Sequence, residues 1–175
     1  MTYVIIAIIF ILVLLIFIVT GNYLRLKGLN QNIDICSNNI EEVLNKKKIL
    51  IEKLIKKIDD EKLFDLYNKL TDELVLFEKE ELLFNINWEI NKYIRNNNLY
   101  ENKDFYDDDI NKTIKSLIIL EEEIEGLEEY YNSNVVNYNE KYYKKPFTFI
   151  YNILKFDPKK GFKLRKLEEY EILKN

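Results

Sequence analysis

Clustered carboxylates are the residues of this chain whose types and spacing could do chemistry. Six glutamates fall within nine positions: Glu121, Glu122, Glu123, Glu125, Glu128 and Glu129. Facing carboxylates on neighbouring helices can hold divalent metal ions, and di-iron bundles combine them with His in Glu-x-x-His motifs. The chain has no His, which argues strongly against the di-iron kind. Since charge runs usually face water, we expect a solvated helix face that binds no metal and no cofactor.

The rest of the composition excludes further kinds of catalytic site and partner. Without His there is no Ser-His-Asp triad and no His-based acid–base catalysis. The single cysteine, Cys36, forms no internal disulfide and suits a reducing compartment. A net charge of −4 offers no concentrated basic face for phosphates, so we expect no nucleic-acid partner. We predict no catalytic residues and no enzyme, with a carboxylate-based metal-dependent or other enzyme as the alternative.

Lysines and aromatic residues provide two candidate contact surfaces. Lys46 to Lys48 form either a solvated face or a site for an acidic partner. Four further residues share one face of a predicted helix: Tyr131, Val135, Tyr138 and Tyr142. They form either an aromatic surface for a partner or part of the core, and helically spaced aromatics usually pack. Asn132 and Asn139 also share a face, where they could fix a helix register, bond a neighbouring backbone or cap the turn near Pro146.

These side chains must be positioned by helices, the first of which begins with an apolar run. Every residue from Tyr3 to Val19 is apolar or aromatic, and as a helix the run is ~26 Å long, close to the span of a bilayer. A cleaved signal peptide would need a basic start and a small-residue cleavage site, and a core helix would be apolar on one stripe only. We therefore predict an uncleaved single-pass anchor whose partner is the lipid bilayer, through residues 3–19.

The flanks of the run predict its orientation. Basic residues stay on the cytoplasmic side of a membrane, and Arg25 and Lys27 follow the run whereas Met1 and Thr2 precede it. We expect the N-terminus outside and the bulk of the chain in the cytoplasm.

Apolar residues after the run recur at helical spacing. A stripe from Leu26 to Leu54, interrupted by Lys47, predicts that the first helix continues to about Ile58, and Asp59 and Asp60 supply the turn and the next N-cap. Later patterns predict helices over about 61–96, 107–144 and 147–155. The predicted helix over 107–144 has an unbroken seven-residue repeat: Ile110, Leu117, Ile124, Tyr131 and Tyr138.

This succession predicts an all-α fold. No run alternates apolar and polar residues as strands do, and long helices joined by short connections pack antiparallel. We expect an N-terminal transmembrane helix that continues into an antiparallel up-and-down bundle of three long helices and a short C-terminal one.

Two motifs resemble the bacterial LemA family. The first is Ile40-Glu41-x-x-Leu44-x-Lys46-Lys47-x-x-Leu50-Ile51-x-x-Leu54-Ile55. The family usually has a Pro after the Leu-Ile pair and a Trp shortly before the motif, where this chain has Glu52 and Ser37. The departures identify a divergent member.

The second motif is more specific. Tyr131-Asn132-x-x-Val135-x-x-Tyr138-Asn139 is followed by Pro146, Phe156-x-Pro158 and Phe162, and residue types and spacings agree with the family's C-terminal signature. The resemblance implies residues 1–20 as the anchor, 21–162 as a LemA-like bundle and 163–175 as a charged tail. It implies no catalytic residues, because the family's biochemical activity is not established.

Three hypotheses on function follow. The first is a membrane-anchored, non-enzymatic scaffold that binds another membrane protein, a peptide or a copy of itself. The second is the carboxylate enzyme, which would need three or more inward-facing carboxylates around one point. The third is a lipid-sensing or membrane-remodelling role, which would need an exposed apolar face between Phe147 and Leu154.

Overall fold

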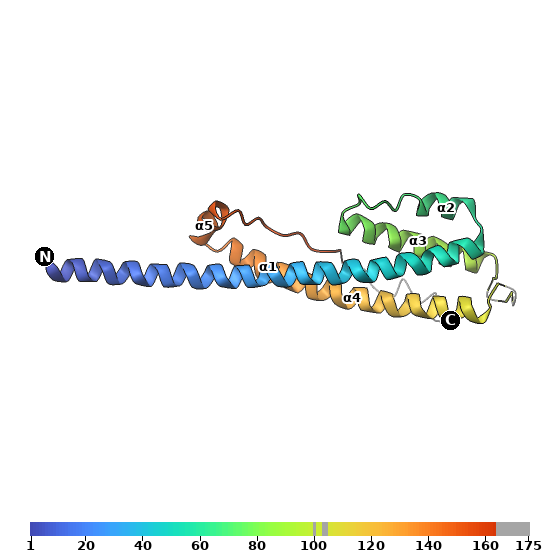
Figure 1. The fold of residues 1–175 in the computed structure, drawn as a ribbon, viewed down its shortest axis with the longest axis horizontal. Helices are drawn as coiled ribbons and strands as arrows, with labels where there is room; N and C mark the ends of the chain where they lie inside the picture. The colour runs from blue at the N-terminus through green and yellow to red at the C-terminus, as the bar shows by residue number, and fades with distance from the viewer. Residues whose placement is uncertain (100, 103–104, 164–175) are drawn as a thin grey trace. The chain divides into compact units, whose positions relative to one another are not determined.

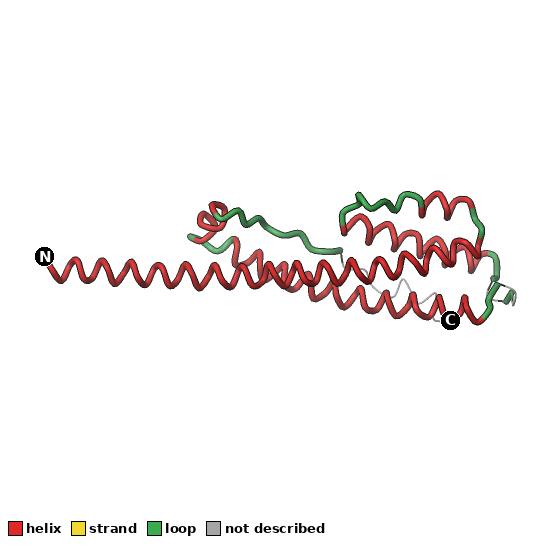
Figure 2. Tube along the Cα trace, viewed as in Figure 1, coloured by secondary structure: helices red, strands yellow, loops and turns green. Residues whose placement is uncertain are grey.

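The computed structural model describes residues 1–99, 101–102 and 105–163, and all regular structure in these ranges is helical (Figures 1 and 2). In chain order the helices are α1 (Thr2–Ile58), α2 (Glu61–Tyr67), α3 (Leu76–Asn96), α4 (Asp108–Tyr142) and α5 (Phe147–Ile153). The predicted all-α fold is confirmed. The predicted tail lies outside the described residues apart from Lys163.

The chain forms two compact units, to which α1 and α4 both contribute. The N-terminal unit comprises Met1–Cys36 and Tyr130–Gly161, and the central unit comprises Ser37–Glu129 with Phe162 and Lys163. Within the central unit, Lys47 of α1 contacts Glu121 of α4, and further along α1 Lys53 contacts Asp109. Because the residue numbers of the contacting pairs rise along α1 while they fall along α4, the two helices are antiparallel, as predicted.

Helix α1 is continuous from Thr2 to Ile58, as its pattern predicts. Gly21 and Gly28 do not interrupt it, and beside Gly21 the Asn22 Nδ2 donates to the Ile18 carbonyl oxygen at 2.8 Å. The helix ends where Asp59 adopts a left-handed backbone with φ 55°, a conformation that Asp tolerates better than most residues. Asp60 then caps α2, its Oδ1 accepting from the Leu63 N–H at 3.0 Å, so both roles predicted for this pair are confirmed.

The predicted helix over 61–96 is wrong as a single element, because the chain breaks between α2 and α3. The break contains Asn68, Thr71 and Asp72, whose short polar side chains compete with the helical backbone for hydrogen bonds. Glu78 then caps α3, its Oε2 accepting from the Val75 N–H at 3.4 Å. Helix α2 folds back onto α3 (Figure 1).

The core follows the predicted stripes with three exceptions. Buried positions include the entire seven-residue repeat of α4, from Ile110 to Tyr138. Two large apolar residues, Ile35 of α1 and Trp88 of α3, are 59% and 37% exposed. Lys47, predicted as a polar interruption facing solvent or an acidic partner, is 1% exposed. The central unit therefore holds a charge inside its core.

Candidate functional site

A buried polar cluster joins three helices of the central unit. The Nζ of Lys47 on α1 lies 2.5 Å from Oε1 of Glu121 on α4. The same oxygen accepts a hydrogen bond from Nδ2 of Asn87 on α3, at 2.9 Å. All three residues are at least nine-tenths buried. Because the ammonium and the carboxylate neutralise each other and the amide bonds the same oxygen, the cluster pairs its buried charges as such charges require.

A second ion pair lies nearer the surface of the same unit. Lys79 on α3 is buried, and its Nζ donates to Oε1 of Glu41 on α1 at 3.2 Å. The Glu41 side chain is 52% exposed, so this pair is partly solvated. The first pair joins α1 to α4 and the second joins α3 to α1, so charge as well as packing holds the three helices together.

The acidic run on α4 divides between two faces, so the prediction of one solvated face is wrong at two positions. Glu121 and Glu128 are buried, at 6% and 5% exposure, whereas Glu122, Glu123 and Glu129 are exposed. Burial, and then the charges of Glu129 and Glu122, raise the pKa of Glu125. The reason for the split is spacing: residues seven apart share the face that packs inward.

The carboxylates of the run do not converge on one point. Within the described residues, no group of three or more His, Cys, Asp or Glu side chains is arranged to hold a metal ion. Glu121 instead uses one oxygen to bond a cation and an amide. This arrangement supports a structural role for the acidic residue that sequence reasoning assigned to solvent.

The C-terminal motif forms a clamp in the N-terminal unit. Asn139 on α4 makes two bonds with the backbone of Lys159: its Nδ2 donates to the carbonyl oxygen at 2.8 Å, and its Oδ1 accepts from the N–H at 2.9 Å. The hydroxyl of Tyr138, in turn, donates to the carbonyl oxygen of Asp157 at 3.0 Å. The returning segment 156–161 has no regular structure of its own, so these side chains satisfy backbone groups that it leaves open.

Gly161 and the motif residue Asn132 lie close together at the end of the clamp. A Cβ on Gly161 would lie 2.6 Å from Oδ1 of Asn132, so a larger residue here would force the Asn132 side chain or the segment to shift. Of the roles predicted for Asn139, the bond to a neighbouring backbone is the one that the structure shows, at Lys159. The Tyr138 hydroxyl is buried, and this burial, with smaller contributions from Tyr142 and Asp157, raises its pKa to about 12.

Aromatic rings fill the space between α4, α5 and the clamp. The buried Tyr142 stacks between Tyr138 and Tyr151, at centroid distances of 6.4 and 6.3 Å, and its hydroxyl donates to Asn152. The aromatic face of α4 is therefore core, and the alternative of an aromatic partner surface is wrong for these residues. Burial raises the pKa of the nearby Cys36 thiol, although a hydrogen bond with the Tyr131 backbone partly opposes the change.

The remaining predicted signature residues serve packing and chain direction. Ile40, Leu44 and Leu54 are buried in the central unit, as are Tyr131 and Val135 in the N-terminal unit. Leu50 and Phe156 are half-buried, and Pro146 and Pro158 are exposed. Pro146 precedes α5 as its N-cap, after a cis peptide bond from Lys145. Phe162 is buried against Phe77, with ring centroids 4.3 Å apart.

A shallow apolar groove on the central unit is a candidate interaction site that the sequence did not reveal. It has a volume of about 460 Å³ and lies between α1 and α4, where it is lined by Lys46, Ile49, Leu50, Ser116, Ile119 and Leu120. Ile49 and Ile119 are 66% and 63% exposed. Exposed large aliphatic side chains that lie together mark a surface that can bury apolar area against another protein.

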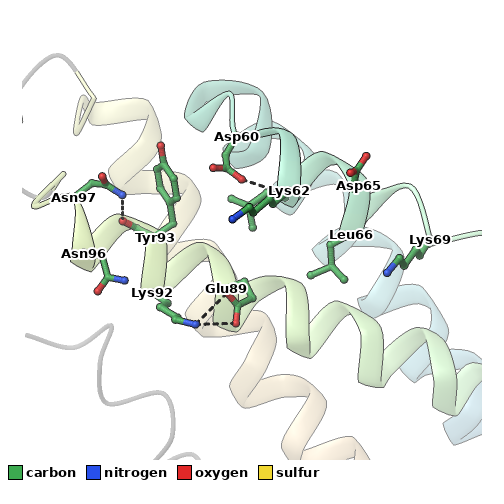
Figure 3. Close-up of a pocket in the computed structure, with 11 residues that line it drawn as sticks. Asp60, Lys62, Asp65, Leu66, Lys69, Glu89, Lys92, Tyr93, Asn96 and Asn97 are labelled. Carbon is green, nitrogen blue, oxygen red and sulfur yellow. Dashed lines mark hydrogen bonds and ion pairs between the residues drawn. The ribbon is translucent and has the colours of Figure 1, made fainter.

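A more polar pocket lies between α2 and α3 (Figure 3). Its volume is about 550 Å³. Its walls carry acidic residues and lysines in equal number: Asp60, Asp65 and Glu89 against Lys62, Lys69 and Lys92. Figure 3 shows Leu66 directed from α2 toward α3, and Lys92 paired with Glu89 at 3.4 Å. The balanced charges favour neither an anionic nor a cationic ligand.

Comparison of the chain with protein-family models, with curated proteins and with solved structures found no match.

Proposed function

We propose that this chain is a membrane-anchored, non-enzymatic interaction module of the LemA type. Residues 3–19 cross the bilayer as an uncleaved single span, the N-terminus lies outside, and the helices that follow lie in the cytoplasm. The anchor holds the helical units at the membrane, where the central unit binds a protein partner.

One observation carries this proposal: α1 is a single helix whose two ends have opposite environments. Among the described helices α1 alone has the length and apolarity to cross a membrane, and its apolar window is 0% buried. This lack of burial favours a membrane span over the alternative of a soluble core helix. The same helix continues into the packed interior at Leu26, Ile33 and Ile40. A signal peptide ends at a cleavage site, whereas here regular helix runs past the apolar residues without a break.

The proposed orientation rests on Arg25 and Lys27, which follow the span and are exposed. Positive residues beside a span are retained in the cytoplasm. Fusions of a periplasm-active phosphatase and of a cytoplasm-active reporter to the C-terminus test it. Activity of the reporter alone is expected, and activity of the phosphatase would reverse the orientation.

The LemA assignment is supported by the way the motif residues are used. Asn139 of the motif bonds the backbone of Lys159, which lies between the motif residues Pro158 and Phe162. Fixed spacing along the chain is what a clamp of this kind requires. The same residues make no constellation for catalysis, which favours a structural reading of the motif.

The interaction role is supported by the apolar groove beside Ile49 and Ile119. A photo-crosslinking amino acid at Ile119, in the full chain in intact membranes, tests it. We expect a discrete adduct with a membrane protein, a peptide or a second copy. The control is the same probe at Val136, which is on α4 and 56% exposed but does not line the groove. Equal labelling at both positions, or none at Ile119, would contradict the interaction role.

A further inference from the structure

The short helix α5 presents apolar side chains that the fold does not cover. Phe149, Ile153 and Leu154 are 72%, 65% and 46% exposed. Phe149 and Ile153 are four residues apart and therefore share a face of the helix. Tyr151 projects on the opposite side and is buried, where it packs against Tyr142 and Phe156. One side of α5 therefore packs against the rest of the unit, and the other, apolar side is exposed on the surface.

The position of α5 along α1 places this face close to the end of the apolar run. Phe156, three residues beyond α5, makes an edge contact with Tyr23 of α1 at a centroid distance of 5.8 Å. Tyr23 is four residues beyond Val19, the last residue of the run, so it lies only ~6 Å further along the helix. Figure 1 shows α5 beside this part of α1. The headgroup layer of a bilayer begins at this depth.

The residues around α5 are strongly basic, although the whole chain has a net charge of −4. Between positions 141 and 160 the only acidic residue is Asp157. The same stretch contains the lysines Lys141, Lys144, Lys145, Lys155, Lys159 and Lys160. Lys144, Lys145 and Lys155 are exposed at the two ends of α5. Apolar side chains flanked by lysines are the chemistry of a segment that lies in the interface of an anionic membrane.

We propose that α5 is a second membrane contact, which docks on the same bilayer that α1 crosses. Phe149, Ile153 and Leu154 enter the boundary between headgroups and acyl chains, and the flanking lysines bind anionic phospholipid headgroups. The inference rests on the proposed anchor, because only an inserted α1 brings α5 to this depth. In this arrangement α5, held by the clamp, fixes the N-terminal unit against the membrane surface.

The test uses the full chain reconstituted in phosphatidylcholine vesicles with or without phosphatidylglycerol. A Cys36→Ala background receives one new cysteine, which is labelled with an environment-sensitive fluorophore. The labelled variants are Ile153→Cys on α5, Leu12→Cys in the apolar run and Tyr130→Cys as the control. Tyr130 is 53% exposed and belongs to the same unit, but it adjoins Tyr131, which bonds Cys36, far beyond the apolar run. Lipids with a nitroxide near the headgroup then quench any label in the interface.

With phosphatidylglycerol present, we expect loss of fluorescence and a blue shift at Ile153 but neither at Tyr130. Replacement of Lys144, Lys145 and Lys155 by Gln should return the Ile153 label toward the Tyr130 level. The matched control replaces the exposed Lys62, Lys69 and Lys92 of the central unit and should change nothing. The proposal would be overturned if the Ile153 label were not quenched, or if replacing Lys144, Lys145 and Lys155 left its quenching unchanged. It would also be overturned if the blue shift followed only the protein-to-lipid ratio.

The Leu12 label separates this inference from the anchor itself. Deeper nitroxides should quench it in every vesicle if α1 is inserted. Quenching at Leu12 without quenching at Ile153 would overturn the docking of α5 and leave the anchor intact. Lack of quenching at Leu12 would overturn both.

Discussion

Lys47 and Glu121 form an ion pair, 2.5 Å from Nζ to Oε1, whose two side chains are 1% and 7% exposed. The pair joins α1 to α4 in the interior of the central unit, and Asn87 of α3 bonds the same carboxylate oxygen. A hydrophobic pair of similar size would often be as stable. The charges add a requirement for register: α1 and α4 must meet at one position of each helix, or both charges are buried without a partner.

Lys47→Met should destabilise the chain by ~3–5 kcal/mol, because it leaves the Glu121 carboxylate buried without its cation. The double variant Lys47→Met with Glu121→Gln should recover most of the loss, since Gln keeps an acceptor for Asn87. Urea unfolding of the full chain in detergent, followed by circular dichroism, measures both. Lys46→Met removes the adjacent but exposed pair with Glu42 and should leave the midpoint unchanged. A double variant as unstable as the single one would contradict this account of the cluster.

Asn139→Asp should loosen the segment 156–161. The new carboxylate keeps an acceptor for the Lys159 N–H but faces the Lys159 carbonyl oxygen without a donor, at a cost of ~1–3 kcal/mol for the unsatisfied group. Faster amide hydrogen exchange in that segment is the expected result. Asn137→Asp makes the same change two residues away at an exposed position, and there exchange should stay as in the parent. Similar exchange in both variants would argue against the clamp.

Two glycine substitutions should change stability in opposite directions. Gly161→Ala places a Cβ 2.6 Å from Oδ1 of Asn132, and the crowding should cost ~1–3 kcal/mol. Gly126→Ala lies within α4 with nothing within 4 Å of the new Cβ, and should stabilise by ~0.5–1 kcal/mol through helix propensity. Thermal unfolding of the two variants and the parent chain measures both changes in stability. Adding Asn132→Ala to Gly161→Ala should recover part of the loss, and a neutral Gly161→Ala would show that the contact is not tight.

Glu125 should make the chain more stable as the pH falls. Burial and the charges of Glu129 and Glu122 raise its pKa in the folded state above the ordinary value. The folded form therefore binds the proton more tightly than the unfolded form, and stability is gained as the pH falls through the folded pKa. Glu125→Gln should raise stability at neutral pH and remove this acid-side gain. Glu140→Gln, at an exposed position of α4, should keep the gain, and a pH profile unaltered by Glu125→Gln would refute the assignment.

The helices themselves were largely predictable, because long apolar periodicities leave few alternatives. The seven-residue repeat of α4 and the continuity of α1 past Gly21 follow from the pattern alone. The break between α2 and α3 did not follow, since apolar residues continue through it at helical spacing and Leu70 is still buried there. Its signal was the group of Asn68, Thr71 and Asp72, where side chains compete for backbone hydrogen bonds.

The candidate site was predictable only in part. The C-terminal motif located the clamp residues, but their bonds to the backbone of residues 157 and 159 depend on where an irregular segment returns. Glu121 was assigned to solvent and Lys47 to solvent or an acidic partner, because the sequence around a single charge does not identify its partner on another helix. The groove at Ile49 and Ile119 was missed for the same reason: it exists only once α1 and α4 are side by side.

The central claim is that the apolar run and the first helix of the fold are one rigid element in the membrane. Spin labels at Phe17 and Ile35, in a Cys36→Ala background reconstituted in lipid vesicles, test it by the distance between them. Both side chains are exposed, and their 18-residue separation is about five helical turns, or ~27 Å along one face. We predict a single narrow distance distribution centred near that value. A broad distribution, or one centred at a clearly shorter distance, would show that α1 bends or unwinds between the run and the packed part, and would contradict the account.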